Sequence, residues 1–512
     1  MKRWRILLAG LALSAALAGC ASLPPLDGRV ASAAIAPSAD TAIGKALAPL
    51  TAAHPGVSGV YALLDGRDAF AARVMMADAA ERSLDVQYYI WRDDTTGTLL
   101  ADALRRAAER GVRVRLLLDD NNTAGLDSQL ALLDALPNLE VRLFNPYPMR
   151  QLRALGLAGD FARLNRRMHN KSFTADAQAT IVGGRNVGDE YFDATGEVLF
   201  ADLDIMAVGA VVADVEQDFD RYWNSASAYP LASLIAPPSA REVAARTVRS
   251  DRNEQTPAAH AYLQAIRAST FARQLSDRTL PFEWVPVQLV SDDPGKATGN
   301  WTPENGLAYR LPELFGTPEH QADLVSPYFV PGPLWTARFE VLAGSGVALT
   351  ILTNSLEATD VAAVHAGYAK WRKPLVASGI RLLELKRTWP RSKQPKRGVG
   401  GSSATSLHAK TIGVDQRRLF VGSFNFDYRS ADLNTEMGFV IDSPALAARM
   451  AQVLDEDVPA LSYEVKLTPE GQLYWLEQGP AGPVRHDTEP GTSWWQRMSV
   501  RLLSLLPIDW LL

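Results

Sequence analysis

The chain has 512 residues, of which 47% are hydrophobic and 21% are charged, and its formal net charge is −5. This length predicts about two to three domains with ample hydrophobic core. Beyond the N-terminus the sequence has no series of long apolar stretches, which excludes a protein that crosses a membrane many times.

Residues 1–20 resemble a bacterial lipoprotein signal peptide. Basic residues precede a short apolar stretch from Ile6 to Ala16, and the segment ends in Leu-Ala-Gly-Cys20, which is similar to a lipobox. Cys20 is the only cysteine of the chain, so it has no thiol partner. We predict lipidation of Cys20, with an ordinary cleaved signal or a buried cysteine as the alternatives. In such lipoproteins an aspartate after the cysteine marks inner-membrane retention. Ala21 stands there instead, which favours an outer-membrane protein that faces the periplasm.

The next segments predict a tether and then a folded lobe. Residues 21–55 are rich in alanine, proline and serine, which is typical of a flexible tether. The first lobe is expected over residues 56–235. Its βαβ pattern comprises a strand over Leu84–Trp91, a helix over Gly97–Arg110 and a strand over Val112–Leu118.

The stretch from Met168 to Asn186 contains candidate catalytic residues. It contains His169, Lys171, Asp176, two glycines and Asn186, and each returns or is matched 239 residues later at His408, Lys410, Asp415, Gly422-Ser423 and Asn425. A single His-x-Lys arises often by chance, but two copies in register do not. We therefore interpret the two stretches as duplicated catalytic half-sites.

The second half repeats the secondary-structure pattern as well as the motif. Residues 236–285 are expected to connect the halves, and residues 286–470 to form the second lobe. A strand over Asp323–Val330, a helix over Leu334–Ala343 and a strand over Val347–Thr353 match the first βαβ unit. Such alternation predicts an α/β fold with mixed sheets flanked by helices.

Two basic stretches and the tail indicate contact with lipid. Residues 146–167 mix arginines with apolar side chains and lead into His169, and residues 386–397 carry Trp389 and precede His408. Such loops attract anionic headgroups at about 1 kcal/mol per basic residue, although they would also be stable as solvated loops. The tail, residues 471–512, ends in an amphipathic segment rich in tryptophan and arginine. This composition suits a membrane interface, with packing on the second lobe as the alternative.

The twin His-x-Lys motifs resemble those of the phospholipase D superfamily. Within it the chain is similar to bacterial cardiolipin synthases of the C type. The resembling stretches are Asp85–Trp91, Leu116–Thr123, Arg163–Phe173, Leu352–Leu356, Val364–Trp371 and Leu506–Leu512. The resemblance implies two phospholipase D-like lobes with the active site at their interface. It also implies transfer of a phosphatidyl unit to phosphatidylglycerol, with phosphatidylglycerol or phosphatidylethanolamine as donor.

The resemblance assigns roles to the motif residues. His169 is expected to be the nucleophile that forms a phosphohistidine and His408 the acid, because a neutral imidazole attacks phosphorus and a protonated one donates to the leaving oxygen. Lys171, Lys410, Asn186 and Asn425 are expected to donate to the phosphate oxygens. This scheme needs neither a metal nor a cofactor.

A carboxylate that orients each imidazole is a further feature of that superfamily. Asp202 and Glu436 follow the two motifs and are the candidates by position, with Asp176 and Asp415 also available. The sequence leaves open which carboxylate serves which histidine.

Three functions remain open from the sequence. The first is phosphatidyl transfer that makes cardiolipin. The second is hydrolysis by the same chemistry, acting on phospholipid or, with less support, on nucleic acid. The third is a non-catalytic envelope lipoprotein, which the intact twin motifs disfavour. The expected partners are phospholipids and a membrane surface, without nucleic acid, and the sequence names no protein partner.

Overall fold

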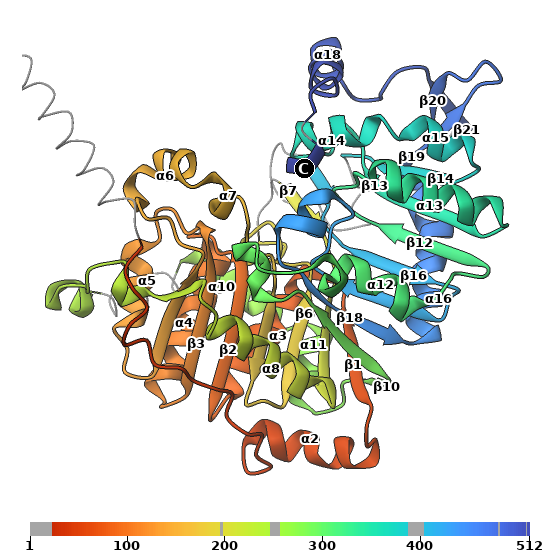
Figure 1. Ribbon diagram of the computed structural model, residues 1–512. Coiled ribbons are helices and arrows are strands. Elements are labelled where there is room, and N and C mark those ends of the chain that lie inside the picture. The colour runs from red at the N-terminus through yellow and green to blue at the C-terminus, as the bar shows by residue number, and fades with distance from the viewer. Residues whose placement is uncertain (1–22, 195–197, 246–255, 388–403, 480–481, 508) are drawn as a thin grey trace, which may run out of the picture.

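The computed structural model describes residues 23–194, 198–245, 256–387, 404–479, 482–507 and 509–512. Cys20, the signal peptide and most of the basic stretch 386–397 lie outside these residues. The fold consists of two lobes, each a mixed sheet covered by helices (Figure 1), as expected from the sequence. In the part of the chain that the structure describes, no helix is long and apolar enough to cross a membrane.

The first lobe begins with an N-terminal helix and continues through ten strands. Its elements are α2 (Ala42–Ala53), β1 (Ser58–Leu63), α3 (Gly66–Ala79), β2 (Ser83–Ile90), α4 (Thr95–Glu109), β3 (Arg113–Asn122), α5 (Asp127–Asp134), β4 (Leu139–Phe144), η1 (Arg150–Leu152), α6 (Arg153–Gly159), α7 (Phe161–Leu164), β5 (Ser172–Ala175), β6 (Ala179–Gly183), β7 (Val198–Ala201), β8 (Asp204–Gly209), α8 (Val211–Trp223), β9 (Ala228–Pro230), η2 (Leu231–Ser233), α10 (Pro257–Arg267), α11 (Thr270–Ser276) and β10 (Glu283–Val285).

The second lobe follows directly and ends with the C-terminus. Its elements are β11 (Val287–Ser291), η3 (Pro294–Thr298), η4 (Pro303–Asn305), α12 (Leu307–Phe315), β12 (Gln321–Val325), α13 (Gly332–Gly344), β13 (Ala348–Asn354), α14 (Ala362–Ala369), α15 (Arg372–Ala377), β14 (Arg381–Leu385), β15 (Ala404–Leu407), β16 (Thr411–Val414), β17 (Arg418–Gly422), η5 (Arg429–Leu433), β18 (Met437–Asp442), α16 (Pro444–Gln452), η6 (Val453–Asp457), α17 (Val458–Leu461), β19 (Ser462–Leu467), β20 (Leu473–Gly479), β21 (Gly482–His486), α18 (Trp494–Leu503) and η7 (Asp509–Leu511).

The two large sheets have the same arrangement of six central strands. The first sheet has the order β10-β1-β8-β6-β5-β2-β3-β4-β9, and the second β11-β18-β17-β16-β12-β13-β14-β19-β20-β21. In each core three parallel strands, β2-β3-β4 or β12-β13-β14, adjoin three antiparallel ones. Strands β2 and β3 are buried over most of their length although both contain polar residues, because helices cover both of their faces.

An apolar layer joins the lobes. Val182 and Ile205 of the first sheet pack with Val421, Phe439 and other apolar residues of the second sheet in one buried cluster. Backbone hydrogen bonds add to this contact, because β7 of the first lobe pairs in parallel with β15 of the second. The lobes therefore meet as a packed interface, and the residues beside it are held in fixed positions.

The expected tether differs from the structure over residues 29–53. Arginines of the first lobe donate to backbone carbonyls of this segment: Arg142 to Val30 (2.7 Å), Arg113 to Ala33 (2.7 Å) and Arg115 to Ser32 (3.1 Å). Side chains on the sheet thus fix a segment whose composition alone predicts flexibility. We call residues 29–41 the strap, which leads into α2.

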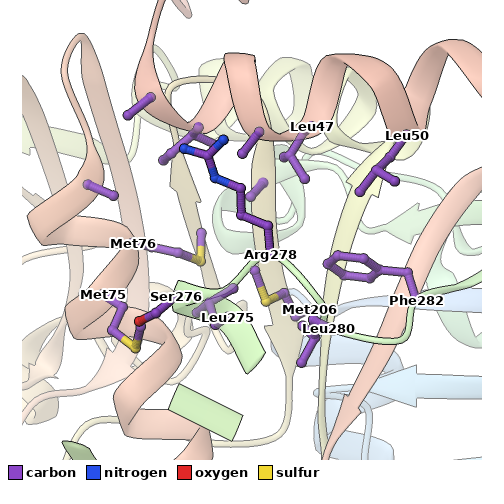
Figure 2. Close-up of a pocket in the computed structure, with 15 residues that line it drawn as sticks. Leu47, Leu50, Met75, Met76, Met206, Leu275, Ser276, Arg278, Leu280 and Phe282 are labelled. Atoms are coloured by element: carbon purple, nitrogen blue, oxygen red, sulfur yellow. The ribbon is translucent and has the colours of Figure 1, made fainter. Parts of the chain in front are cut away.

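Helix α2 covers a cavity of about 290 Å³ against the first sheet (Figure 2). Apolar side chains line it, among them Leu47, Leu50, Met206 and Phe282, and Arg278 extends along it. Helix α2 lies at the opposite end of the molecule from α6 and α18 (Figure 1). None of the motif residues lines this cavity, so the expected chemistry belongs elsewhere.

Two other boundaries also differ from those expected. Within the expected connection, residues 236–285, β10 pairs with β1 and Tyr262 of α10 donates to the carbonyl of Phe192 (2.6 Å), so this part belongs to the first lobe. Within the expected tail, residues 471–512, β20 and β21 extend the second sheet. Helix α18 packs its Val500 against Leu356 and Ala366. Composition alone did not reveal these pairings.

Candidate active site at the lobe interface

Each His-x-Lys motif is bonded to the backbone of the opposite lobe. The amide of His169 donates to the carbonyl of Thr435 (2.8 Å), and Thr435 donates back to Arg167 (2.8 Å). In the other half the amide of His408 donates to the carbonyl of Ala201 (2.8 Å). The segments that carry Asp202 and Glu436 are therefore placed beside the histidine of the other lobe.

The carboxylates are exchanged between the lobes. Nδ1 of His169 lies 2.8 Å from Oε2 of Glu436, and Nδ1 of His408 lies 2.6 Å from Oδ2 of Asp202. This arrangement answers the question that the sequence left open. A carboxylate on Nδ1 fixes the tautomer and leaves Nε2 of each ring for chemistry. All four residues are less than a tenth exposed.

The surroundings of the two imidazoles make them unequal. Burial, reinforced by Lys171, Lys410 and His408, holds the pKa of His169 well below its ordinary value. Burial and Lys410 also lower the pKa of His408, but Asp202 opposes them. His169 is therefore the ring that favours the neutral form, and His408 keeps a partner that stabilises its cation.

The pKa values of the two carboxylates shift in opposite directions. Burial raises the pKa of Glu436 to about 7, although Lys171 opposes the shift. Burial also disfavours the charged form of Asp202, yet His408, Lys410 and Arg185 outweigh it and hold the pKa of Asp202 below its usual range. The half-site around His408 thus has a fixed negative charge, whereas the half-site around His169 has a carboxyl group that titrates near neutrality.

Two buried lysines supply positive charge at the centre. Burial lowers the pKa of Lys171 to about 7 and that of Lys410 to about 8. Nζ of Lys171 donates to the carbonyl of His169 (2.6 Å), and Nζ of Lys410 donates to that of His408. Their ammonium groups therefore lie beside the imidazoles, where a phosphate would need compensation.

The structure adds groups that hold Glu436 in place. The hydroxyl of Ser423 donates to its carboxylate, and Oδ2 of Asp292 accepts from its backbone amide (2.9 Å). Lys296 is fully buried and pairs with Asp292 at 2.9 Å. Sequence reasoning missed Asp292 and Lys296 because they lie at the start of the expected second lobe, far from either motif.

Each motif imidazole also has a tyrosine ring against it. The ring of Tyr89 meets His169 edge-on at 4.9 Å between centroids, and that of Tyr191 meets His408 at 5.1 Å. These contacts restrict the tilt of the imidazoles. The only sequence signal was the position of Tyr89 at the end of an expected strand.

The two motif asparagines occupy different surroundings. Oδ1 of Asn186 accepts from the amide of Ile90 (3.1 Å), and its Nδ2 donates to the hydroxyl of Tyr191 (3.1 Å). Asn186 therefore positions Tyr191. Asn425 is buried, and within the described residues its Oδ1 accepts no hydrogen bond.

Asp176 and Asp415 do not contact either imidazole, contrary to the expectation that they were available to them. The carboxylate of Asp176 accepts the amides of Glu81, Arg82 and Ser83, just before β2. Asp415 repeats this pattern with the three amides before β12. Both aspartates follow the strand that leads away from the motif histidine and adopt positive φ of 51°. They fasten turns at the far end of these strands.

The basic stretch 146–167 also differs from expectation. Arg150 pairs with Asp120 and Asp127, Arg153 pairs with Asp120, and Arg163 pairs with Asp160, so these guanidinium groups are neutralised within the fold. The side chains that the stretch exposes are apolar instead. The described part of this surface is therefore more apolar and less basic than the sequence indicates.

Exposed apolar side chains gather at one end of the molecule. Of the fifteen large apolar side chains that the described residues expose, nine lie on η1, α6, α7 and the C-terminal segment. We call these nine the apolar rim: Leu152, Leu155, Phe161, Trp494, Trp495, Leu502, Leu505, Leu506 and Trp510. Phe161 meets Trp510 edge-on at 6.5 Å, so the two lobes are in contact through side chains of this set.

The chain end is anchored between the lobes, beside the site. Arg429 donates to the carbonyl of Leu511 (3.0 Å) and to Oδ1 of Asn165 (2.7 Å). The side chain of Leu512 is buried with Val330 and Val364, against Tyr328. The last residues are thus packed into the fold where the two lobes meet.

Comparison with known proteins places this arrangement in a family. A family model described as "Cardiolipin synthase, PLD-like domain" matches residues 74–223 and 311–458, one range in each lobe. The chain is 48% identical over 471 residues to Cardiolipin synthase C of Escherichia coli, covering 92% of this chain and 99% of that protein. It is 24% identical to the Major cardiolipin synthase of Bacillus subtilis, over 78% of this chain and 69% of that protein.

A solved structure supports the same fold at low identity. Phosphatidylserine synthase of Haemophilus influenzae superposes with a TM-score of 0.54 at 15% identity, covering 83% of this chain and 92% of that chain. That likeness concerns the fold, whereas the family model and the relatives concern the sequence of both lobes. The chain therefore belongs to the cardiolipin synthase family of proteins with phospholipase D-like domains.

Proposed function

We propose that this protein transfers a phosphatidyl unit from a donor phospholipid to phosphatidylglycerol and so makes cardiolipin. The observation that carries the proposal is the reciprocal pairing of His169 with Glu436 and of His408 with Asp202 across the lobe interface. It creates a single buried centre with two imidazoles and two lysines. The similarity to a cardiolipin synthase over nearly the whole chain supports the same reaction.

In the first step Nε2 of His169 attacks the donor phosphorus. A P–N bond forms, the bond from phosphorus to the headgroup oxygen breaks, and His408 gives its proton to that oxygen. The product is a phosphatidyl group on His169 and a free headgroup alcohol. Lys171 and Lys410 stabilise the negative charge that the non-bridging oxygens carry in the transition state.

In the second step a hydroxyl of phosphatidylglycerol replaces the headgroup. His408, now neutral, takes the proton of this hydroxyl, whose oxygen bonds to phosphorus while the P–N bond breaks. Cardiolipin leaves, and both imidazoles return to their first protonation states. The low pKa of His169 supports its role as the nucleophile, and the fixed charge of Asp202 supports His408 as the acid and base.

The remaining motif residues have supporting roles in this proposal. Asn425 donates to the phosphate from the second lobe, and Asn186 acts through Tyr191. Asp176 and Asp415 stabilise the fold and take no part in the reaction, since each carboxylate caps the turn before a central strand.

The placement of the protein on a membrane forms part of the proposal. A lipid on Cys20 would hold the chain at the periplasmic face of the envelope, with the outer membrane favoured by Ala21. The apolar rim would then sink into the leaflet and bring the active-site mouth to its phospholipids. The strap supports this placement, because Arg29 donates to the carbonyls of Asn224 (2.8 Å) and Ala228 (3.0 Å), beside the strand β4 that leads to α6.

The lipid products of purified protein test the proposal. Mixed micelles of phosphatidylglycerol and phosphatidylethanolamine, with either lipid labelled in its acyl chains, should yield labelled cardiolipin and free headgroup in equal amounts. Phosphatidic acid as the sole product would mean that water, and not a lipid hydroxyl, reaches the phosphohistidine. The protein would then be a phospholipase, and the transfer reaction would be contradicted.

A further inference from the structure

A buried ion pair lies behind the contact between His169 and Glu436. Asp292 directly follows β11, and Oδ2 of its carboxylate lies 2.9 Å from Nζ of Lys296 in η3. The same Nζ donates to the carbonyl of Ser430 (3.0 Å), and neither charged side chain is exposed. Because the loss of hydration offsets most of the attraction in a buried ion pair, such a pair contributes little to stability by itself. Its place next to the site indicates another role.

Asp292 forms two hydrogen bonds with the backbone of Glu436. Its Oδ2 accepts from the amide of Glu436 (2.9 Å), and its own amide donates to the carbonyl of Glu436 (2.9 Å). Asp292 is in turn held by both lobes, because its Oδ1 accepts from the amide of Leu307 in α12 (2.7 Å) and its carbonyl accepts from the hydroxyl of Tyr222 in α8 (2.9 Å). The backbone of Glu436 is therefore fixed by an aspartate that is itself anchored.

The carboxylate of Glu436 has few hydrogen bonds of its own. Oε2 lies 2.8 Å from Nδ1 of His169 and accepts from the hydroxyl of Ser423, whereas Oε1 accepts no hydrogen bond within the described residues. The position of this carboxylate beside the imidazole therefore depends on where the backbone of Glu436 is held. A displacement of about 1 Å in an active site can lower the rate about a hundredfold, so this anchoring bears on the reaction at Nε2 of His169.

The other half-site anchors its carboxylate residue with a cation from the motif itself. The guanidinium of Arg185 donates to the backbone carbonyls of Asp202 (2.7 Å) and of Leu63 at the end of β1 (2.8 Å). The residue 239 positions later is Phe424, which is buried in the apolar core of the second lobe. The repeated position thus carries no cation in the second lobe, and Lys296 of η3 lies behind the carboxylate residue instead.

We propose that Asp292 and Lys296 are positioning residues, which hold Glu436 and through it orient His169 for attack on phosphorus. The proposal rests on the proposed function, since His169 is the nucleophile of that reaction. Lys296 fixes the carboxylate of Asp292, which fixes the backbone of Glu436. Glu436 in turn fixes the ring of His169. Because both residues act through Glu436, their loss lowers kcat and leaves KM unchanged.

The test measures headgroup release from a soluble short-chain phosphatidylglycerol by the variant Lys296→Met, which keeps an apolar stem and removes the ammonium group. We expect kcat to fall about tenfold and KM to stay within about twofold. In a chain that already carries Glu436→Ala, Lys296→Met should change kcat by less than about twofold, because the group through which it acts is absent. Asp292→Asn combined with Lys296→Met leaves no unpaired buried charge that would prevent folding, and should show the same loss as Lys296→Met.

Arg372→Met is the matched control, because Arg372 of α15 forms a buried ion pair with Glu384 of β14 (2.7 Å) in the same lobe. It should lower the midpoint of thermal unfolding as Lys296→Met does, and leave kcat unchanged. Three results would overturn the proposal: an unchanged kcat in folded Lys296→Met, an equal loss in Arg372→Met, or a further loss in the chain with Glu436→Ala. The expected loss with phosphatidic acid as the sole product would support this proposal and contradict the transfer reaction alone, because hydrolysis also needs His169.

Discussion

Replacement of His169 or His408 by alanine is expected to lower turnover by at least about a thousandfold. His169→Ala removes the atom that would bond to phosphorus, and His408→Ala removes the proton donor for the headgroup oxygen. The two residues serve one catalytic cycle, so the double variant should be about as slow as either single variant. Rates of headgroup release from micellar phospholipid measure all three.

The control for these variants is His260→Ala, because His260 is exposed on α10, away from the lobe interface. Its turnover and its thermal unfolding should match those of the unaltered protein. Turnover within tenfold of normal in either catalytic variant would show that the imidazole concerned is not required. Multiplicative losses in the double variant would show that the two histidines act in separate processes.

Polar substitutions in the apolar rim are expected to weaken membrane contact about a hundredfold. The variant combines Leu155→Ser, Trp495→Ser and Leu505→Ser, whose side chains are 55%, 73% and 77% exposed. A large apolar side chain transferred into an apolar phase contributes about 1.5–3 kcal/mol, so partial insertion of three accounts for the expected change. Binding to phospholipid vesicles measures it, in a chain that also carries Cys20→Ala so that no lipid anchor compensates.

Turnover on two kinds of substrate should distinguish a loss of membrane contact from a loss of catalysis. The rim variant should lose activity on vesicles but retain activity on soluble short-chain phospholipids. A control variant, with serine at Leu334, Val341 and Val484, removes three other exposed apolar side chains outside the rim and should bind vesicles normally. Equal losses on both substrates would mean that the rim supports the fold. Point substitutions are preferable to deletion of the tail, because Leu512 is buried.

The sequence predicted the two-lobed fold because its elements are encoded locally and twice. The repeat at His169 and His408 identified the half-sites, and hydrophobic patterning located the βαβ units within a few residues of their observed bounds. One expected strand, Asp323–Val330, ends early at Val325. There the hydroxyl of Ser326 bonds to the carbonyl of Tyr328 and the chain leaves the sheet.

Contacts between segments that are far apart in the chain could not be predicted from the sequence. Glu436 lies 267 residues from His169, and Asp202 lies 206 residues from His408, so no local pattern could pair them. The same limit explains the segment around Val30, where arginines on the sheet fix a backbone of low-complexity sequence. The same limit explains why the sequence did not indicate that Arg150 forms an ion pair with Asp120.

Capture of the covalent intermediate tests the account most directly. A donor phospholipid labelled at its phosphorus is mixed with the protein, the reaction is quenched in base within one turnover, and the peptides are separated. A P–N bond survives base and is cleaved by acid, so we expect an acid-labile label on the peptide that contains His169, and none in His169→Ala. Label on the peptide with His408, or cardiolipin formation without any covalent label, would contradict the roles assigned to the two histidines.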